Sequence, residues 1–161
     1  MRSDRSLSRF SKNHLYYEIE MLILVGDALL HQPPHGIPLQ NALIESFGIH
    51  LRQIIEFLYY DKPWGDDVTA KDYVDAANEK AWLRVRRPLP QRLKRARHRA
   101  HKELVHLTIK RNAGRGRKKA WPVPALLKAM RRPLAIFCQH ALRRRLHSAV
   151  RDLVAQGPWG P

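Results

Sequence analysis

The stretch LQNALIESFGIHLRQIIEFLYY, residues 39–60, decides the fold. Its large apolar residues recur every three or four positions, which gathers them on one side of an α-helix. This apolar stripe consists of Leu43, Ile44, Phe47, Leu51, Ile54, Ile55 and Leu58. The opposite side carries Asn41, Glu45, Arg52 and Glu56, so the pattern predicts a long helix that buries one side in a core. His50 lies within the stripe, where we expect a core histidine with a hydrogen-bonded ring.

Residues 13–31 repeat the helical period but are apolar on two sides. One side carries Leu15, Ile19, Leu22, Gly26 and Leu29, and the other carries Tyr17, Met21, Leu24 and Ala28. A helix of this kind is buried between neighbouring helices or covered by a second subunit. The proline-rich segment HQPPHGIP, residues 31–38, ends it, because proline cannot continue a helix.

Two further helices are predicted in the second half of the chain. The first covers about 90–110 and has an apolar arc made of Leu93, Ala96, Ala100, Leu104 and Leu107. The second begins after Pro124, is kinked or split at Pro133 and extends to about residue 155. No segment alternates with the period of two that a half-buried strand requires.

Four long helices predict an all-α protein, most simply an up-and-down four-helix bundle with a long connection between its second and third helices. We expect a single domain over residues 13–155, a flexible N-terminal tail at 1–12 and a C-terminal tail at 156–161. Within the connection at 61–90, Thr69 and Asp72 have the spacing of a capping box and predict a short helix.

Charge is distributed unevenly along the chain, whose formal net charge is +16. Residues 1–80 contain 8 basic and 12 acidic side chains, whereas residues 81–161 contain 22 basic and 2 acidic ones. The second half is therefore expected to contact a polyanion, nucleic acid before an anionic membrane surface. Arginine-rich coding is an alternative source of basic residues, but it leaves the near absence of acidic residues after Lys80 unexplained.

The cysteine count and the apolar runs exclude several classes of protein. Cys138 is the only cysteine, so the chain forms no internal disulfide or thiolate metal site, and we expect a small core residue in a reducing compartment. The longest apolar run, residues 21–26, is far too short to span a membrane, and no signal-peptide cleavage site follows it. We therefore expect a cytoplasmic protein without membrane contact.

Metal ions and cofactors are not expected either. His98, His101 and His106 do not all share one helix face, and the surrounding positive charge opposes a cation. No motif in the chain has the spacing of a phosphate-binding loop.

The segment RARHRAHKELVH, residues 95–106, concentrates groups that can act on phosphates. Arg99 and His106 are seven residues apart and share the side of a regular helix that lies opposite its apolar arc, with Glu103 within reach of both. An arginine can bind a phosphate, and a histidine can act as general acid or base in RNA cleavage. Two helical turns separate the pair by about 10.8 Å, so Arg99 must curl along the helix or a second subunit must complete the site. The alternative is a solvated basic helix with an Arg99–Glu103 pair.

Further basic residues around this segment are candidates for nucleic-acid contact. They are Arg95, Lys102, Lys110, Arg111, Arg115, Arg117, Lys118 and Lys119. Trp121 follows them and either stacks on a base or packs the loop against the body of the protein. Arg143, Arg144 and Arg145 form a second basic cluster, or simply solvate their segment.

The sequence Arg99-AHKELV-His106 resembles the motif of the HEPN superfamily, in which an arginine precedes a histidine by four to six intervening residues on the third helix of a four-helix bundle. Together with NALIESFGIHLRQIIEFLY at 41–59 and GDDV at 65–68, it looks like an uncharacterised bacterial HEPN-like family, with similarity over about 40–122. The resemblance implies an all-helical fold and frequent dimerisation. In many members it also implies metal-independent RNA cleavage in toxin–antitoxin or phage-defence systems, with Arg99 and His106 at the positions of the catalytic pair.

Two functions follow as expectations. The first is a homodimeric HEPN-like protein that binds RNA and acts as a metal-independent endoribonuclease through Arg99, His106 and Glu103, with a cognate antitoxin as a partner. The second is a catalytically inactive helical module that binds nucleic acid or a partner protein through its basic C-terminal half. Many HEPN domains lack nuclease activity, so the resemblance leaves both open.

Overall fold

The computed structural model describes residues 2–31, 36–60, 65–105 and 121–159, and every regular element in these ranges is helical, as the sequence predicts. Helix α1 (Asp4–Phe10), a π-helical segment (Ser11–Leu15) and α2 (Tyr16–His31) form one continuous helix. They are followed by α3 (Ile37–Tyr59), α4 (Glu79–Arg86), α5 (Gln91–Arg99), α6 (Val123–His140) and α7 (Ser148–Gln156). A second π-helical segment, Ala100–Val105, extends α5, and two short 3₁₀ turns occupy Ala70–Tyr73 and Ala76–Asn78.

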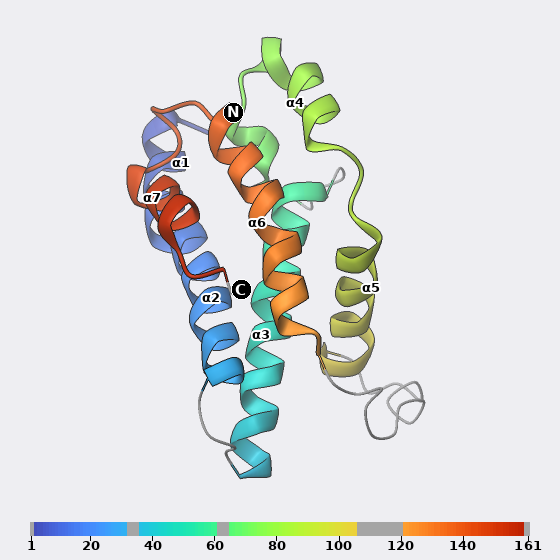
Figure 1. The fold of residues 1–161 in the computed structure, drawn as a ribbon. Coiled ribbons are helices and arrows are strands. Elements are labelled where there is room, and N and C mark those ends of the chain that lie inside the picture. The colour runs from blue at the N-terminus through green and yellow to red at the C-terminus, as the bar shows by residue number, and fades with distance from the viewer. Residues whose placement is uncertain (1, 32–35, 61–64, 106–120, 160–161) are drawn as a thin grey trace.

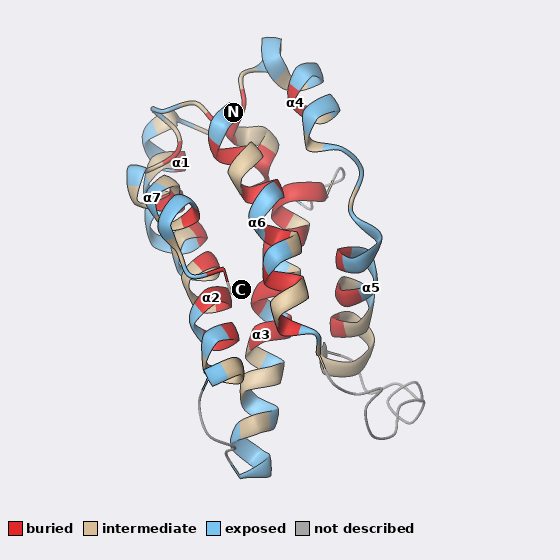
Figure 2. Ribbon diagram, in the orientation of Figure 1, coloured by how far each residue is buried: buried red, intermediate tan, exposed pale blue. Residues whose placement is uncertain are grey.

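The longest helices pack side by side in alternating directions. In Figure 1, α2, α3, α5 and α6 run alternately down and up the molecule, and α7 runs alongside α2. Helix α2 packs against α3, α6 and α7, while α5 packs against α3 and α6. The buried residues face inward from each of these helices (Figure 2). Phe57 of α3, Tyr73 and Phe137 of α6 meet edge to face, with ring centroids 5.2–5.8 Å apart.

Several expectations about single residues are confirmed. The Thr69 amide donates to an Asp72 carboxylate oxygen at 2.8 Å and completes the capping box. His50 is buried, and its Nδ1 lies 2.7 Å from Oε2 of Glu18 on α2, so it is a core histidine with a hydrogen-bonded ring. Cys138 is buried in the core, where burial raises the pKa of its thiol to about 11.

The N-terminal segment is helical from Asp4 rather than a flexible tail. Ser3 caps α1, and Leu7 is buried with 2% of its surface exposed. Asp4 accepts hydrogen bonds from Arg145 at 2.6 Å and from Arg144 at 2.5 Å, in a connection far along the chain. The expectation of a tail was wrong because these partners are remote in sequence and a single large apolar residue gives no periodic signal.

Arg145 is the centre of this contact between the two ends of the chain. Its guanidinium also donates to the carbonyls of Asp72 at 2.9 Å and Val74 at 3.3 Å, and only 18% of its side chain is exposed. The hydrogen bond from Arg145 is the main cause that lowers the pKa of the Asp4 carboxyl. Because this folded-state pKa is depressed, the stability from the contact is present above about pH 4 and is lost as pH falls through the folded value.

The C-terminal helix differs from its predicted form. Helix α6 continues through the buried Pro133 and ends at His140, so the expected split at Pro133 does not occur and the helical stretch is broken instead at residues 141–147. Arg151 of α7 donates to the carbonyls of Cys138 and Ala141, which satisfies acceptors at the end of α6. With this break, and with α4 inside the long connection, the described residues form six helices instead of four.

The expected C-terminal tail packs on the body after α7 ends at Gln156. Trp159 is buried, and its indole nitrogen donates to the Val154 carbonyl at 3.0 Å. Within the described ranges, no helix is both long and apolar enough to cross a membrane.

Replacing Arg145 by alanine is expected to lower the free energy of unfolding by about 2 kcal/mol, because it removes hydrogen bonds to one carboxylate and two carbonyls. Arg143→Ala is the matched control, since Arg143 is exposed and carries the same charge. We expect that control to change stability by less than about 0.5 kcal/mol. Urea denaturation followed by circular dichroism measures both, and equal effects would contradict the structural role of Arg145.

The thiol of Cys138 is expected to be unreactive in the folded protein, because it is buried and its pKa of about 11 leaves little thiolate near neutral pH. Ellman's reagent at about pH 8 should detect almost no thiol in the native protein and one per chain in concentrated guanidinium chloride. Rapid reaction of the native protein would show that this part of α6 is accessible.

Candidate nucleic-acid interface

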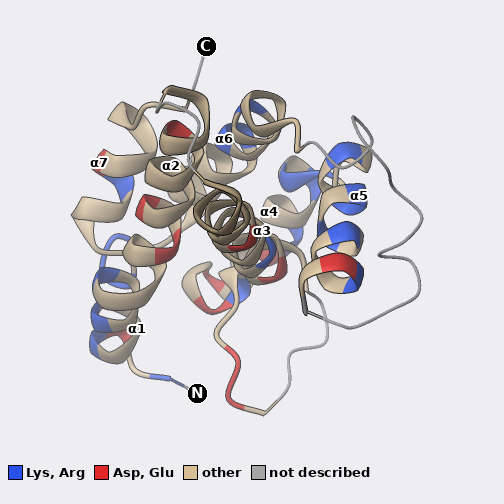
Figure 3. Ribbon diagram, turned by 90° about the horizontal axis from the view of Figure 1, so that it is seen from below, with Lys and Arg blue, Asp and Glu red and all other residues tan. Residues whose placement is uncertain are grey.

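Helix α5 separates an apolar side from a strongly basic one. Leu93 and Ala96 are buried, as is Ala100 at the start of the π-helical segment. The helix carries no acidic residue, and Glu103 is the only one between Glu79 and Asp152 in the sequence. Figure 3 shows lysine and arginine positions along α5 and an acidic position near its end. The field around this helix is therefore positive and suited to an anionic partner.

Three arginines of α5 line one hollow. Arg92, Arg95 and Arg99 recur at intervals of three and four, which places them on the same side of the helix. We call these three residues the α5 ridge. They border a hollow of about 470 Å³ between α5 and the beginning of α6, which is completed by Gln91, Ala96, Trp121, Pro122 and Leu126. Arg92 and Arg95 are exposed and form no ion pair with other described residues.

Arg99 is held in place by two neighbours. Its Nε donates to Oε2 of Glu103 at 2.7 Å, and its guanidinium carbon lies 4.7 Å from the centre of a Trp121 ring. Trp121 itself meets Phe47 edge to face at 6.3 Å and packs partly against the core. The interpretation in which Trp121 packs against the body is therefore confirmed. The contact with Arg99 lies on a ring face that a stacking base would need.

The structure brings together only part of the predicted site. Arg99 and Glu103 are in contact, as their spacing predicts, Arg95 is exposed on the ridge and Lys102 is half-buried in the π-helical segment. The remaining candidates lie outside the described residues: His106, Lys110, Arg111, Arg115, Arg117, Lys118 and Lys119. Sequence reasoning missed Arg92, although its spacing from Arg95 and Arg99 carries the signal.

The helix after Arg99 departs from the geometry on which the Arg99–His106 spacing was based. That spacing assumed a regular α-helix over about 90–110, but Ala100–Val105 is π-helical. A π-helical turn holds more residues than an α-helical one, so the angular position of each later residue shifts. The α-helical spacing of the prediction therefore does not hold through residues 100–105, and His106 itself lies outside the described residues. Apolar periodicity carries no signal for such a segment.

Several arginines of the basic half serve the fold instead of a surface. Arg86 donates to the Leu58 carbonyl at the end of α3 at 2.6 Å and lies over the rings of Tyr59 and Trp82 at 4.8 Å. Arg145 and Arg151 likewise bind carbonyls, and Arg144 pairs with Asp4. In the cluster at 143–145, these contacts favour a structural role over a second nucleic-acid surface.

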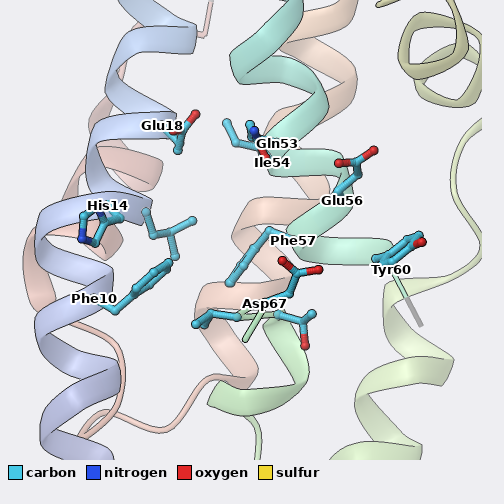
Figure 4. A pocket seen from close by; sticks show the side chains of 12 residues that line it. Phe10, His14, Glu18, Gln53, Ile54, Glu56, Phe57, Tyr60 and Asp67 are labelled. Atoms are coloured by element: carbon cyan, nitrogen blue, oxygen red, sulfur yellow. The ribbon is translucent and has the colours of Figure 1, made fainter. Parts of the chain in front are cut away.

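A second hollow, of about 330 Å³, has the opposite electrostatic character (Figure 4). It lies between the α1–α2 helix and α3, and its lining includes the carboxylates of Glu18, Glu56 and Asp67. Glu18 is bonded to His50, and Glu56 accepts from Arg52 at 2.9 Å. These carboxylates repel a phosphate, so a polyanion is favoured at the α5 ridge and disfavoured here. Among the described residues, no three His, Cys, Asp or Glu side chains gather as metal ligands.

Comparisons with known proteins identify no relative. No family model, no curated protein and no solved structure matches this chain.

Proposed function

We propose that this chain is a HEPN-like helical protein that binds RNA through the α5 ridge. The observation that carries the proposal is the hollow where Arg92, Arg95 and Arg99 stand together beside Trp121. Guanidinium groups donate paired hydrogen bonds to phosphate oxygens, and the almost complete lack of nearby carboxylates removes competition for them.

The two exposed arginines of the ridge have the larger part in this proposal. Arg92 and Arg95 can bind phosphates without breaking an ion pair that the described structure shows. Arg99 is already bonded to Glu103, so its main contributions are positive charge beside the hollow and part of the wall of the hollow. Binding of this kind requires no catalytic chemistry. RNA binding through the α5 ridge is therefore also what we expect of the catalytically inactive module, the second function that the sequence predicts.

The double variant Arg92→Ala/Arg95→Ala is expected to weaken binding of a labelled, mixed-sequence single-stranded RNA by about tenfold or more at low salt, because two phosphate contacts are lost. The slope of log affinity against log salt should fall by about 1.4. Fluorescence anisotropy over about 50–200 mM salt measures both quantities.

The matched control is Arg84→Ala/Arg143→Ala, which removes the same charge from two exposed arginines outside the ridge. We expect this control to bind RNA nearly as tightly as the wild type. Equal weakening in both double variants would show that only net charge matters. Absence of wild-type binding at low salt would overturn the proposal.

RNA cleavage is the second candidate function. The observation that favours it is the placement of the Arg99 guanidinium at the wall of the hollow, where Glu103 holds it. In this candidate, Arg99 stabilises charge on the phosphate, and His106 transfers a proton to or from the 2′-hydroxyl or the leaving oxygen. A role in a toxin–antitoxin or phage-defence system, with a cognate antitoxin, rests on this candidate alone.

Arg99→Ala and His106→Ala should each abolish cleavage of a mixed RNA substrate in EDTA while the RNA stays bound, because each removes one half of the proposed pair. Gel electrophoresis of the RNA, with anisotropy on the same samples, separates cleavage from binding. Arg84→Ala is the control and should cleave like the wild type. Wild-type protein that binds the RNA and leaves it intact would identify the inactive module instead.

A further inference from the structure

The Trp121 ring is fixed against α3 and gives a flat support beside the hollow. It meets the ring of Phe47, a residue of α3 with no exposed surface, edge to face at 6.3 Å. Gly48 lies against the same ring, since a β-carbon at this position would be 3.5 Å from Cη2 of Trp121. Contact with two consecutive residues of a core helix leaves the indole little freedom to tilt.

The guanidinium of Arg99 forms a second flat layer on this support. Its central carbon lies over the Trp121 ring, 4.7 Å from the ring centre, which is within the range of a cation–π contact. Its Nε donates to Oε2 of Glu103 at 2.7 Å, so the group is held at one face and at one edge. The Arg99 side chain is 20% exposed and lines the hollow. We call Trp121 and Arg99 together the stacking platform.

The plane of Arg99 matters more than its charge in this arrangement. The bonded carboxylate of Glu103 offsets the positive charge, which makes Arg99 a weaker phosphate ligand than the exposed Arg92 and Arg95. A guanidinium is also planar and only weakly hydrated, so its faces readily contact other flat groups. Unpaired RNA bases stack on two kinds of protein surface, aromatic rings and arginine planes. The stacking platform contains one of each.

The hollow has the size and the walls that one nucleotide requires. Its volume of about 470 Å³ lies within the range of pockets for small organic ligands. Ala96, Pro122 and Leu126 contribute to its wall, which suits the flat body of a base. Arg95 precedes Arg99 by four residues, about 6 Å along the helix axis. A phosphate can therefore meet Arg95 while the base joined to it rests on the platform.

We propose that the hollow takes up one unpaired base of an RNA strand, stacked on the Arg99 guanidinium, which is itself stacked on Trp121. The inference rests on the proposed RNA binding by the α5 ridge and names the form of RNA that the ridge selects, a single strand. The layers then follow in the order Trp121, Arg99 and base, while Arg92 and Arg95 bind the adjoining phosphates.

An unpaired strand meets the requirement of the platform, and a duplex does not. Both faces of a base inside a duplex are covered by its neighbours, so the base must be unstacked and unpaired before it reaches the hollow. The phosphates are present in both forms and carry no such distinction. Every base has a flat face, so we expect selection of single strands with little preference for sequence.

Fluorescence anisotropy at low salt with three labelled probes of equal length tests the stack. The probes are a mixed-sequence single-stranded RNA, the blunt duplex of that sequence, and an abasic strand with the same ribose and phosphate groups. We expect the wild type to bind the single strand about tenfold more tightly than the abasic strand, because the abasic strand has no base to stack.

Arg99→Lys separates the plane from the charge, since lysine keeps the positive charge and lacks the planar group. In this variant the preference for the single strand over the abasic strand should disappear. The ratio of single-strand to duplex affinity should fall about tenfold. Such a loss still leaves the RNA saturated at high protein concentration, as the cleavage assay with Arg99→Ala requires. Arg84→Lys is the matched control, because Arg84 is exposed on α4 outside the hollow, and both ratios should equal those of the wild type.

The outcomes separate this inference from the function on which it rests. Wild-type binding that is lost in Arg92→Ala/Arg95→Ala, but is indifferent to the bases and to Arg99→Lys, would overturn the stack and leave RNA binding by the ridge standing. Equal changes in Arg99→Lys and Arg84→Lys would likewise overturn the stack alone. Failure of the wild type to bind any of the three probes at low salt would overturn the proposed function and the stack together. A circular dichroism melt of each variant shows that it is folded at the assay temperature.

Discussion

The burial of one side of α3 is the constraint on which the rest of the structure depends. Phe47, Leu51 and Ile54 have no exposed surface, and α2, α5 and α6 all pack against the helix that carries them. Burial of a large apolar side chain contributes about 1.5–3 kcal/mol, so this side of α3 is a major source of the favourable free energy of folding. The same packing positions α5 and therefore the arginines of its ridge.

Features that depend on neighbours in the sequence were predictable from it. The helical period identified the second helix to within two residues at its start, and the i,i+4 spacing predicted the Arg99–Glu103 contact. Features that depend on remote partners were not predictable. Helix α1 is held by Arg145, and the hollow beside the ridge exists only because Trp121 and Pro122 return to α5 in the folded chain. The π-helical segment after Arg99 leaves no mark in the apolar pattern.

The structure divides the basic excess of the second half into two classes. Three arginines of the basic half donate to backbone carbonyls of the fold: Arg86, Arg145 and Arg151. Two of them, Arg86 at the end of α3 and Arg151 at the end of α6, also lie at the negative end of a helix dipole. Arg92 and Arg95 of α5 are instead exposed beside a hollow. The total of +16 therefore overstates the charge that a polyanion meets, and the location of each guanidinium matters more than the sum.

The contact between Asp4 and Arg145 has a consequence for synthesis on the ribosome. The two residues are 141 positions apart, so α1 emerges long before the arginine that holds it. At about 5–20 residues per second, roughly 7 to 28 seconds of translation separate them. During that interval α1 lacks its ion pairs with Arg144 and Arg145, although Tyr73, whose hydroxyl donates to the Leu7 carbonyl, has already been synthesised. The Asp4–Arg145 contact can therefore form only after residue 145 has left the exit tunnel.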